Sequence, residues 1–258
     1  ETPGVPGREE RVRDLILAEI GPAGTLFDEI RTDPMGSLIC TRHPRAGKKG
    51  KAKGKPGRGN ADQGDGPTKV MQLCHMDEIG FYVTAIDKSG FIYVNSAGGF
   101  DTRNLFSRRV LLCTDDGDYV GVMNPAGRPV HISSPKDREK VPEVKEFFVD
   151  IGLPADKVKK KVKIGDYVVM HEPAIQVGEK FVSKALDNRV ACWLGIESVR
   201  KLDKDGSGHA AELTVAFTVQ EEVGLRGAKT ASHAVAPHIG LGIDVTLSCD
   251  TPGVPEEE

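Results

Sequence analysis

The chain has 258 residues, of which 38% are hydrophobic and 28% are charged. These values are ordinary for a globular protein of one large domain or two modest ones. The net charge of −3 gives no reason to expect binding to nucleic acid or to a membrane surface. No apolar run approaches the roughly 20 residues of a membrane-spanning helix. The five cysteines form no Cys-x-x-Cys pair, so we expect reduced thiols in a cytoplasmic protein.

The first 41 residues predict one helix and two short strands. A stripe of apolar residues at helical spacing predicts a core-facing helix from about residue 8: Val12, Leu15, Ile16 and Ile20. Gly21 and Pro22 end it. Strands are expected over residues 26–31 and 37–41, on either side of a turn at residues 33–36.

Residues 42–67 interrupt this pattern with lysine and arginine among glycine and proline, and with no apolar residue larger than alanine. Such a segment buries too little surface to offset its ordering entropy, so it predicts a basic, Gly/Pro-rich disordered loop. A basic arm that binds RNA is the alternative. It is less favoured because no aromatic residue lies between the charges for base stacking.

Residues 79–179 change in character, because short β segments alternate with turn signals there and helical periodicity is scarce. This pattern predicts a small β-barrel or sandwich inserted into an α/β domain. The expected strands are residues 81–86, 91–95, 109–114, 119–123, 147–150 and 166–170.

Alternating strands and helices flank the insert. Buried strands are expected over residues 69–74, 213–219 and 239–243. A helix is expected over residues 189–201, with four apolar side chains facing inward: Val190, Trp193, Leu194 and Leu202. These elements predict an α/β class for the rest of the chain.

Acidic residues gather at the ends of these strands and at the start of the helix. They are joined by one histidine and comprise His75, Asp77, Asp187, Glu221, Glu222 and Asp244. Functional groups in open α/β sheets lie beyond the carboxyl ends of the strands. So many carboxylates would repel one another without cations, and His75 adds an imidazole, which zinc favours. Two glutamates alone would read as a solvated strand end, but the whole set predicts a two-metal hydrolytic site.

These motifs, in this order, resemble the M42 family of metallo-aminopeptidases, the tetrahedral or glutamyl aminopeptidase group. The motifs are residues 75–81 (HMDEIGF), 98–101 (GGFD), 185–189 (ALDNR), 218–228 (TVQEEVGLRGA), and 244–246 (DVT) with 250–253 (DTPG), and the likeness begins at residues 3–9 (PGVPGRE). The resemblance implies an α/β/α metallopeptidase (phosphorylase/hydrolase-like) domain. That domain would comprise residues 1–78 and 180–258, with a PDZ-like β dimerisation domain inserted at residues 79–179.

The resemblance also implies a dinuclear centre of zinc or cobalt, with manganese possible. His75, Asp187 and Asp244 would bind one ion. Asp187 would bridge to a second ion, which Glu222 also binds. A cis peptide is expected between Asp187 and Asn188.

Two further residues receive catalytic roles from the resemblance. Glu221 would act as general base, taking a proton from a metal-activated water and returning it to the leaving amine. Asp77 would orient the imidazole of His75 through its second nitrogen.

The family needs one more histidine ligand after residues 250–253, and neither His233 nor His238 stands at that place. We therefore expect the Glu222 site to lack one protein ligand and the chain to be a fragment. The expected function is removal of N-terminal residues from peptides by a homo-oligomer of dimers in a larger shell. The alternative is a non-catalytic, truncated subunit that acts in assembly or peptide binding.

Overall fold

The computed structural model describes residues 1–47, 66–206 and 208–255 in two compact units. One unit contains residues 1–15, 77–185 and 219–226, and the other the described parts of 16–76, 186–218 and 227–258. Residues 48–65, which make up most of the predicted basic loop, lie outside the described residues. No helix in the described ranges is long and apolar enough to cross a bilayer.

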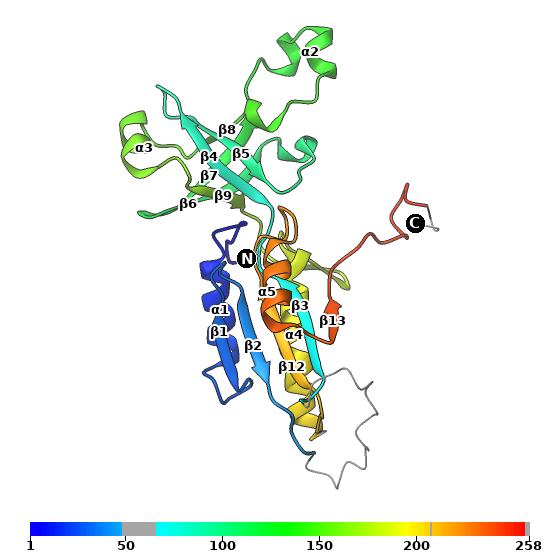
Figure 1. Ribbon diagram of the computed structural model, residues 1–258. Coiled ribbons are helices and arrows are strands. Elements are labelled where there is room, and N and C mark those ends of the chain that lie inside the picture. The colour runs from blue at the N-terminus through cyan, green and yellow to red at the C-terminus, as the bar shows by residue number, and fades with distance from the viewer. Residues whose placement is uncertain (48–65, 207, 256–258) are drawn as a thin grey trace. The chain divides into compact units, whose positions relative to one another are not determined.

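The first unit is built on a closed barrel of six antiparallel strands (Figure 1). Its strands are β4 (Gly80–Ile86), β5 (Ile92–Ala97), β6 (Arg108–Thr114), β7 (Gly117–Pro125), β8 (Phe147–Asp150) and β9 (Tyr167–Met170). They pair in the order β4-β5-β8-β7-β6-β9. Each of the six strands expected from the sequence is present, and they form a barrel and not a sandwich.

The barrel encloses its own hydrophobic core. Alternate strand residues point inward, and Phe81, Leu112 and Phe147 are fully buried there. Helix α3 (Ala155–Lys161) adds Val158 to the same core. The remaining short elements of this region are η1 (Thr102–Leu105), η2 (Val130–Ile132), α2 (Pro135–Glu139), η3 (Val144–Glu146) and the hairpin of β10 (Ile175–Val177) and β11 (Lys180–Val182).

The second unit is built on a five-stranded mixed sheet. Its order is β1 (Glu29–Thr32), β2 (Leu38–Arg42), β12 (Glu212–Thr218), β3 (Lys69–His75) and β13 (Ile239–Gly242). Strands β12, β3 and β13 run parallel, and the last residue of β12, Thr218, pairs with His75. Residues that follow β12 therefore leave the sheet beside the carboxyl end of β3.

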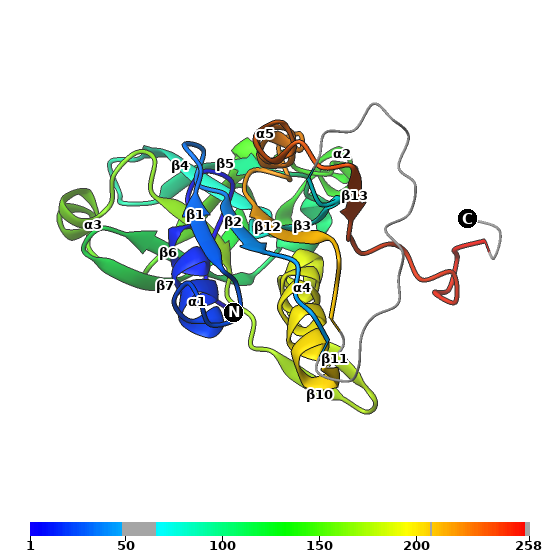
Figure 2. The same cartoon turned by 60° about the horizontal axis from the view of Figure 1, so that its bottom comes forward.

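Helices cover both faces of this sheet, as Figure 2 shows for α4 (Leu186–Asp205) and α5 (Arg226–Val235). Met71 of β3 packs with Ala231 of α5. On the other face α4 comes so close that a Cβ added to Gly195 would lie 2.9 Å from Val215 Cγ1 and 3.3 Å from Cys74 Sγ. The result is the α/β/α arrangement that the resemblance implies.

The inward face of α4 differs from the predicted one. Trp193 and Leu194 are 58% and 40% exposed, whereas the buried apolar and small residues are Ala191, Cys192, Gly195, Ile196 and Val199. The prediction placed the largest apolar side chains inward. It was wrong because the close approach of helix and sheet at Gly195 leaves room only for smaller side chains.

Two other expectations about burial were also wrong. In α1 (Glu10–Ile20), Leu15 is exposed while Val12, Ile16 and Ile20 are buried, so the core-facing stripe is narrower than predicted. Strand β13 is exposed along its whole length, where a buried strand was expected, and among the described strands it pairs with β3 alone.

The strand expected over residues 26–31 begins at Glu29 instead. The amide of Gly24 donates to the carbonyl of Phe27, and this turn occupies the residues before β1. The turn at residues 33–36 is present, with Asp33 Oδ1 accepting from the amides of Met35 and Ser37.

The sheet also buries thiols, as expected for reduced cysteines. Burial raises the pKa of Cys40 and of Cys74 to about 12.

Candidate metal centre

Three of the predicted metal ligands lie together at the carboxyl end of the sheet. His75 Nε2 is 3.1 Å from Asp187 Oδ1 and 3.9 Å from Asp244 Oδ1. One ligand atom from each of the three residues lies within 4.8 Å of the others. We call this group the strand-end trio.

The backbone around the trio is held by hydrogen bonds between its elements. The peptide between Asp187 and Asn188 is cis, as the resemblance implies. The buried Asn188 side chain donates through Nδ2 to the carbonyl of Ile243, 2.7 Å away, and the amide of Ile243 donates to the carbonyl of Leu73. These bonds join α4, β3 and the residue before Asp244. Sequence reasoning missed this role of Asn188, although its position beside Asp187 was a signal.

The trio fits a divalent ion by its donor set and its spacing. Two ligand atoms on a tetrahedral zinc, each at about 2.1 Å from the ion, are about 3.4 Å apart. The separations of 3.1 and 3.9 Å lie on either side of that value. The side chains of Asp187 and Asp244 are 58% and 55% exposed, whereas that of His75 is 3% exposed. The carboxylates can therefore reorient around an ion while the imidazole stays fixed.

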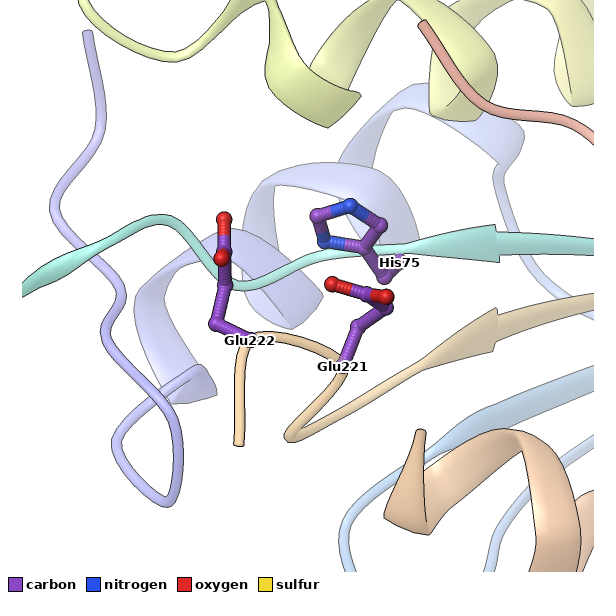
Figure 3. A group of neighbouring side chains, drawn as sticks. All are labelled: His75, Glu221 and Glu222. Carbon is purple, nitrogen blue, oxygen red and sulfur yellow. The ribbon is translucent and has the colours of Figure 1, made fainter. Parts of the chain in front are cut away.

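The two predicted glutamates lie on a turn directly after β12, which we call the glutamate turn (residues 219–226). Figure 3 shows Glu221 and Glu222 on this turn and His75 at the end of β3. The buried Asp77 accepts hydrogen bonds from both glutamate amides, from Glu221 at Oδ1 (3.1 Å) and from Glu222 at Oδ2 (3.0 Å). Sequence reasoning missed this contact and expected Asp77 to orient His75, which stays a prediction.

A further carboxylate, which contacts the same turn from the start of α1, was missed altogether. Glu9 Oε1 accepts a hydrogen bond of 3.0 Å from the amide of Gln220, and its residue is 3% exposed. Burial raises the pKa of Glu9 to about 7, and the charge of Asp77 adds to the rise, while the amides of Gly7 and Gln220 lower it.

Neither His233 nor His238 belongs to the groups of possible metal ligands among the described residues. His238 Nδ1 accepts from the amide of Lys69, the first residue of β3. That strand has 7 residues, so its two ends lie about 20 Å apart at roughly 3.3 Å per residue. His233 lies in the last turn of α5.

Comparison with known proteins finds relatives that are named aminopeptidases. The family profile described as M42 glutamyl aminopeptidase matches residues 59–258. A putative aminopeptidase of Acetivibrio thermocellus is 35% identical over 250 residues, covering 96% of this chain and 64% of that protein. The chain thus spans somewhat less than two thirds of the length of this curated relative.

Solved structures agree with this relationship. An aminopeptidase from the archaeon Desulfurococcus kamchatkensis superimposes with a TM-score of 0.81 at 32% identity, over 99% of this chain and 63% of that one. The TET1 peptidase of Pyrococcus horikoshii gives a TM-score of 0.77 at 27% identity, over 98% of this chain and 69% of that one. The chain has a six-stranded barrel, an α/β/α arrangement around its mixed sheet, and the motifs at the strand ends. It belongs to the M42 glutamyl aminopeptidase family.

Proposed function

We propose that this chain carries the catalytic residues of a metal-dependent aminopeptidase, which hydrolyses N-terminal residues from peptides. The observation that carries the proposal is the strand-end trio, an imidazole and two carboxylates with ligand atoms within 4.8 Å of one another. Membership of the M42 family supports the same reaction class.

We further propose that two divalent ions bind, held as the resemblance implies. His75, Asp187 and Asp244 would hold one ion, and Asp187 and Glu222 the other. Support comes from the register of the sheet, because Thr218 pairs with His75 and the chain enters the glutamate turn from there. The ions, zinc or cobalt with manganese also suitable, would polarise the scissile carbonyl and lower the pKa of water.

Glu221 is the proposed general base and acid. Its carboxylate takes a proton from the attacking water and delivers it to the amine of the leaving peptide. Asp77 contributes by holding the amides of Glu221 and Glu222. The surrounding carboxylates attract the free α-ammonium of a peptide, which favours removal of the N-terminal residue.

The proposed assembly is a cytoplasmic homo-oligomer. The TET1 peptidase of Pyrococcus horikoshii is described as assembling into a tetrahedron or a large octahedral shell. For this chain we propose dimers formed through residues 79–179, which associate further. Light scattering on the purified chain would test this, and a monodisperse monomer at high concentration would contradict it.

The first experiment measures bound metal per chain together with cleavage of a panel of aminoacyl chromogenic substrates. About two ions and turnover, with an N-acetylated substrate left intact, support the proposed function. One ion or none, without turnover, favours the alternative of a non-catalytic subunit. Glu221→Gln serves as the matched control, because it keeps the proposed ligands and removes the base.

A further inference from the structure

The glutamate turn has a backbone conformation that needs external support. Gln220 has a φ of 55° and Leu225 a φ of 58°, in the left-handed region that residues other than glycine rarely adopt. The amide of Leu225 donates to the carbonyl of Glu221, and that of Arg226 to the carbonyl of Gln220. Such conformations persist where surrounding contacts hold them in place.

Three consecutive amides of this turn donate to two carboxylates. The amide of Gln220 donates to Glu9, and those of Glu221 and Glu222 donate to Asp77. Two of these amides belong to Glu221, the proposed base, and Glu222, the proposed ligand, and the third belongs to the residue before them. The two carboxylates therefore fix the backbone from which both functional side chains project.

Glu9 is itself firmly anchored. Its carbonyl accepts from the amides of Val12 and Arg13 in the first turn of α1. The preceding residues are tied to the barrel, because Val5 is buried against Tyr167 and Val169, and the Tyr82 hydroxyl donates to the carbonyl of Pro6.

Helix capping does not explain the Glu9 side chain. A capping side chain accepts from an amide in the first turn of its own helix. Glu9 Oε1 instead accepts from Gly7, before the helix, and from Gln220, which is 211 residues away in sequence. Burying a carboxylate costs free energy, and the hydrogen bonds from the amides of Gly7 and Gln220 offset part of that cost.

We propose that Glu9 is a positioning residue of this aminopeptidase, which holds the amide of Gln220 and thereby fixes the orientation of Glu221 and Glu222. The expected effect of Glu9 on turnover rests on the proposed function. Its expected effect on the conformation of the glutamate turn does not.

The test compares Glu9→Met, which keeps the size and removes the acceptor, with Glu9→Gln, which keeps an oxygen for both amides. Glu10→Met is the matched control, because Glu10 is the neighbouring exposed residue. Kinetics on the metal-loaded 258-residue chain are measured together with hydrogen exchange of residues 219–226 in the metal-free protein.

We expect Glu9→Met to lower kcat by about 10- to 100-fold with a much smaller change in KM, because misplacement of a catalytic group acts on the chemical step. Its amides in the glutamate turn should exchange faster. Glu9→Gln should recover most of both losses. If Glu9→Met does not fold, Glu9→Asp, which is one methylene shorter, replaces it with the same expectations.

Two results would overturn the proposal. One is exchange in the glutamate turn that matches the wild type in Glu9→Met or its replacement. The other is a folded Glu9→Gln variant whose kcat falls as far, and whose glutamate turn exchanges as fast, as in Glu9→Met. If the wild type itself has no turnover, the proposed function fails, while the exchange data still decide whether Glu9 holds the turn.

Discussion

The strand-end trio and the glutamate turn place acidic side chains in opposite ways. In the trio, Asp187 and Asp244 are more than half exposed, and only His75 is buried. In the glutamate turn the backbone is held by two buried carboxylates, Asp77 and Glu9. Residues that bind an ion can be drawn into place by it, whereas a group that transfers a proton has to be placed by the protein. Under the proposed function, the exposed aspartates of the trio bind an ion, whereas the buried carboxylates behind the turn position the general base Glu221 and the ligand Glu222.

The largest expected effect tests the chemical side of this contrast. Glu221→Gln should lower kcat by about 10²- to 10⁴-fold, because the variant cannot accept the proton of the attacking water. Metal content should match that of the wild type. Steady-state kinetics and metal analysis on the same sample check both points, and a kcat near the wild-type value would remove Glu221 as the base.

The binding side is tested by Asp187→Ala. It should weaken metal affinity by about 100-fold or more, because the variant removes a carboxylate from the trio. Competition with a chromogenic chelator measures the affinity. Asp205→Ala, at the exposed end of the same helix, is the control. Equal affinities in the two variants would contradict the assignment.

The buried carboxyl group of Glu9, which contacts the glutamate turn, predicts that the free energy of unfolding depends on pH. The pKa of Glu9 is about 7 in the folded protein, against an ordinary value of 4.5. Folding therefore favours its protonated form, and this stabilisation is fully present below about pH 4.5 and lost as the pH rises through about 7. The loss amounts to on the order of 3 kcal/mol, at about 1.4 kcal/mol per pKa unit.

The variant Glu9→Gln cannot titrate at this position. Its free energy of unfolding should therefore rise relative to that of the wild type as the pH rises from 4.5 to 8. Urea unfolding in the presence of EDTA at both pH values measures the difference. A difference that does not change with pH would show that Glu9 has no such shift in the metal-free protein.

The smallest expected effect belongs to Asp77→Asn. Its amide presents an N–H where Asp77 now accepts a second backbone amide, so one of the two bonds to Glu221 and Glu222 is lost. We expect kcat/KM to fall by about 10- to 100-fold. Asp115→Asn, which removes an exposed carboxylate paired with Lys163 on the barrel, is the control. A fall of the same size in both variants would contradict a specific role for Asp77.

The sequence was sufficient for elements whose pattern is local. The barrel strands alternate inward and outward residues, and turn residues separate them, so residues 81–86 and 147–150 were placed within a residue of the observed strands. The trio was also foreseeable, because His75 and Asp244 each follow an apolar run that ends at the same edge of the sheet.

What the sequence did not reveal depends on contacts between distant residues. The face of α4 is decided by how closely Gly195 approaches Val215, which no periodicity records. The role of Glu9 depends on an amide 211 residues away. Its own sequence context, PGVPGRE, indicates only a turn before a helix. A single acidic residue at a helix start gives no sign that its side chain turns away from that helix.

The burial of Cys74 offers a way to follow motion of the sheet next to His75. Its thiol lies against α4 at Gly195, and its pKa of about 12 keeps it protonated near neutral pH. The thiolate is the form of cysteine that attacks an alkylating reagent, so Cys74 becomes reactive when β3 and α4 separate. Cys249 is only partly buried and can react from the folded protein, which makes it an internal standard. The labelling rate of Cys74 divided by that of Cys249 would report how often β3 and α4 separate, in the unmodified chain and without substrate.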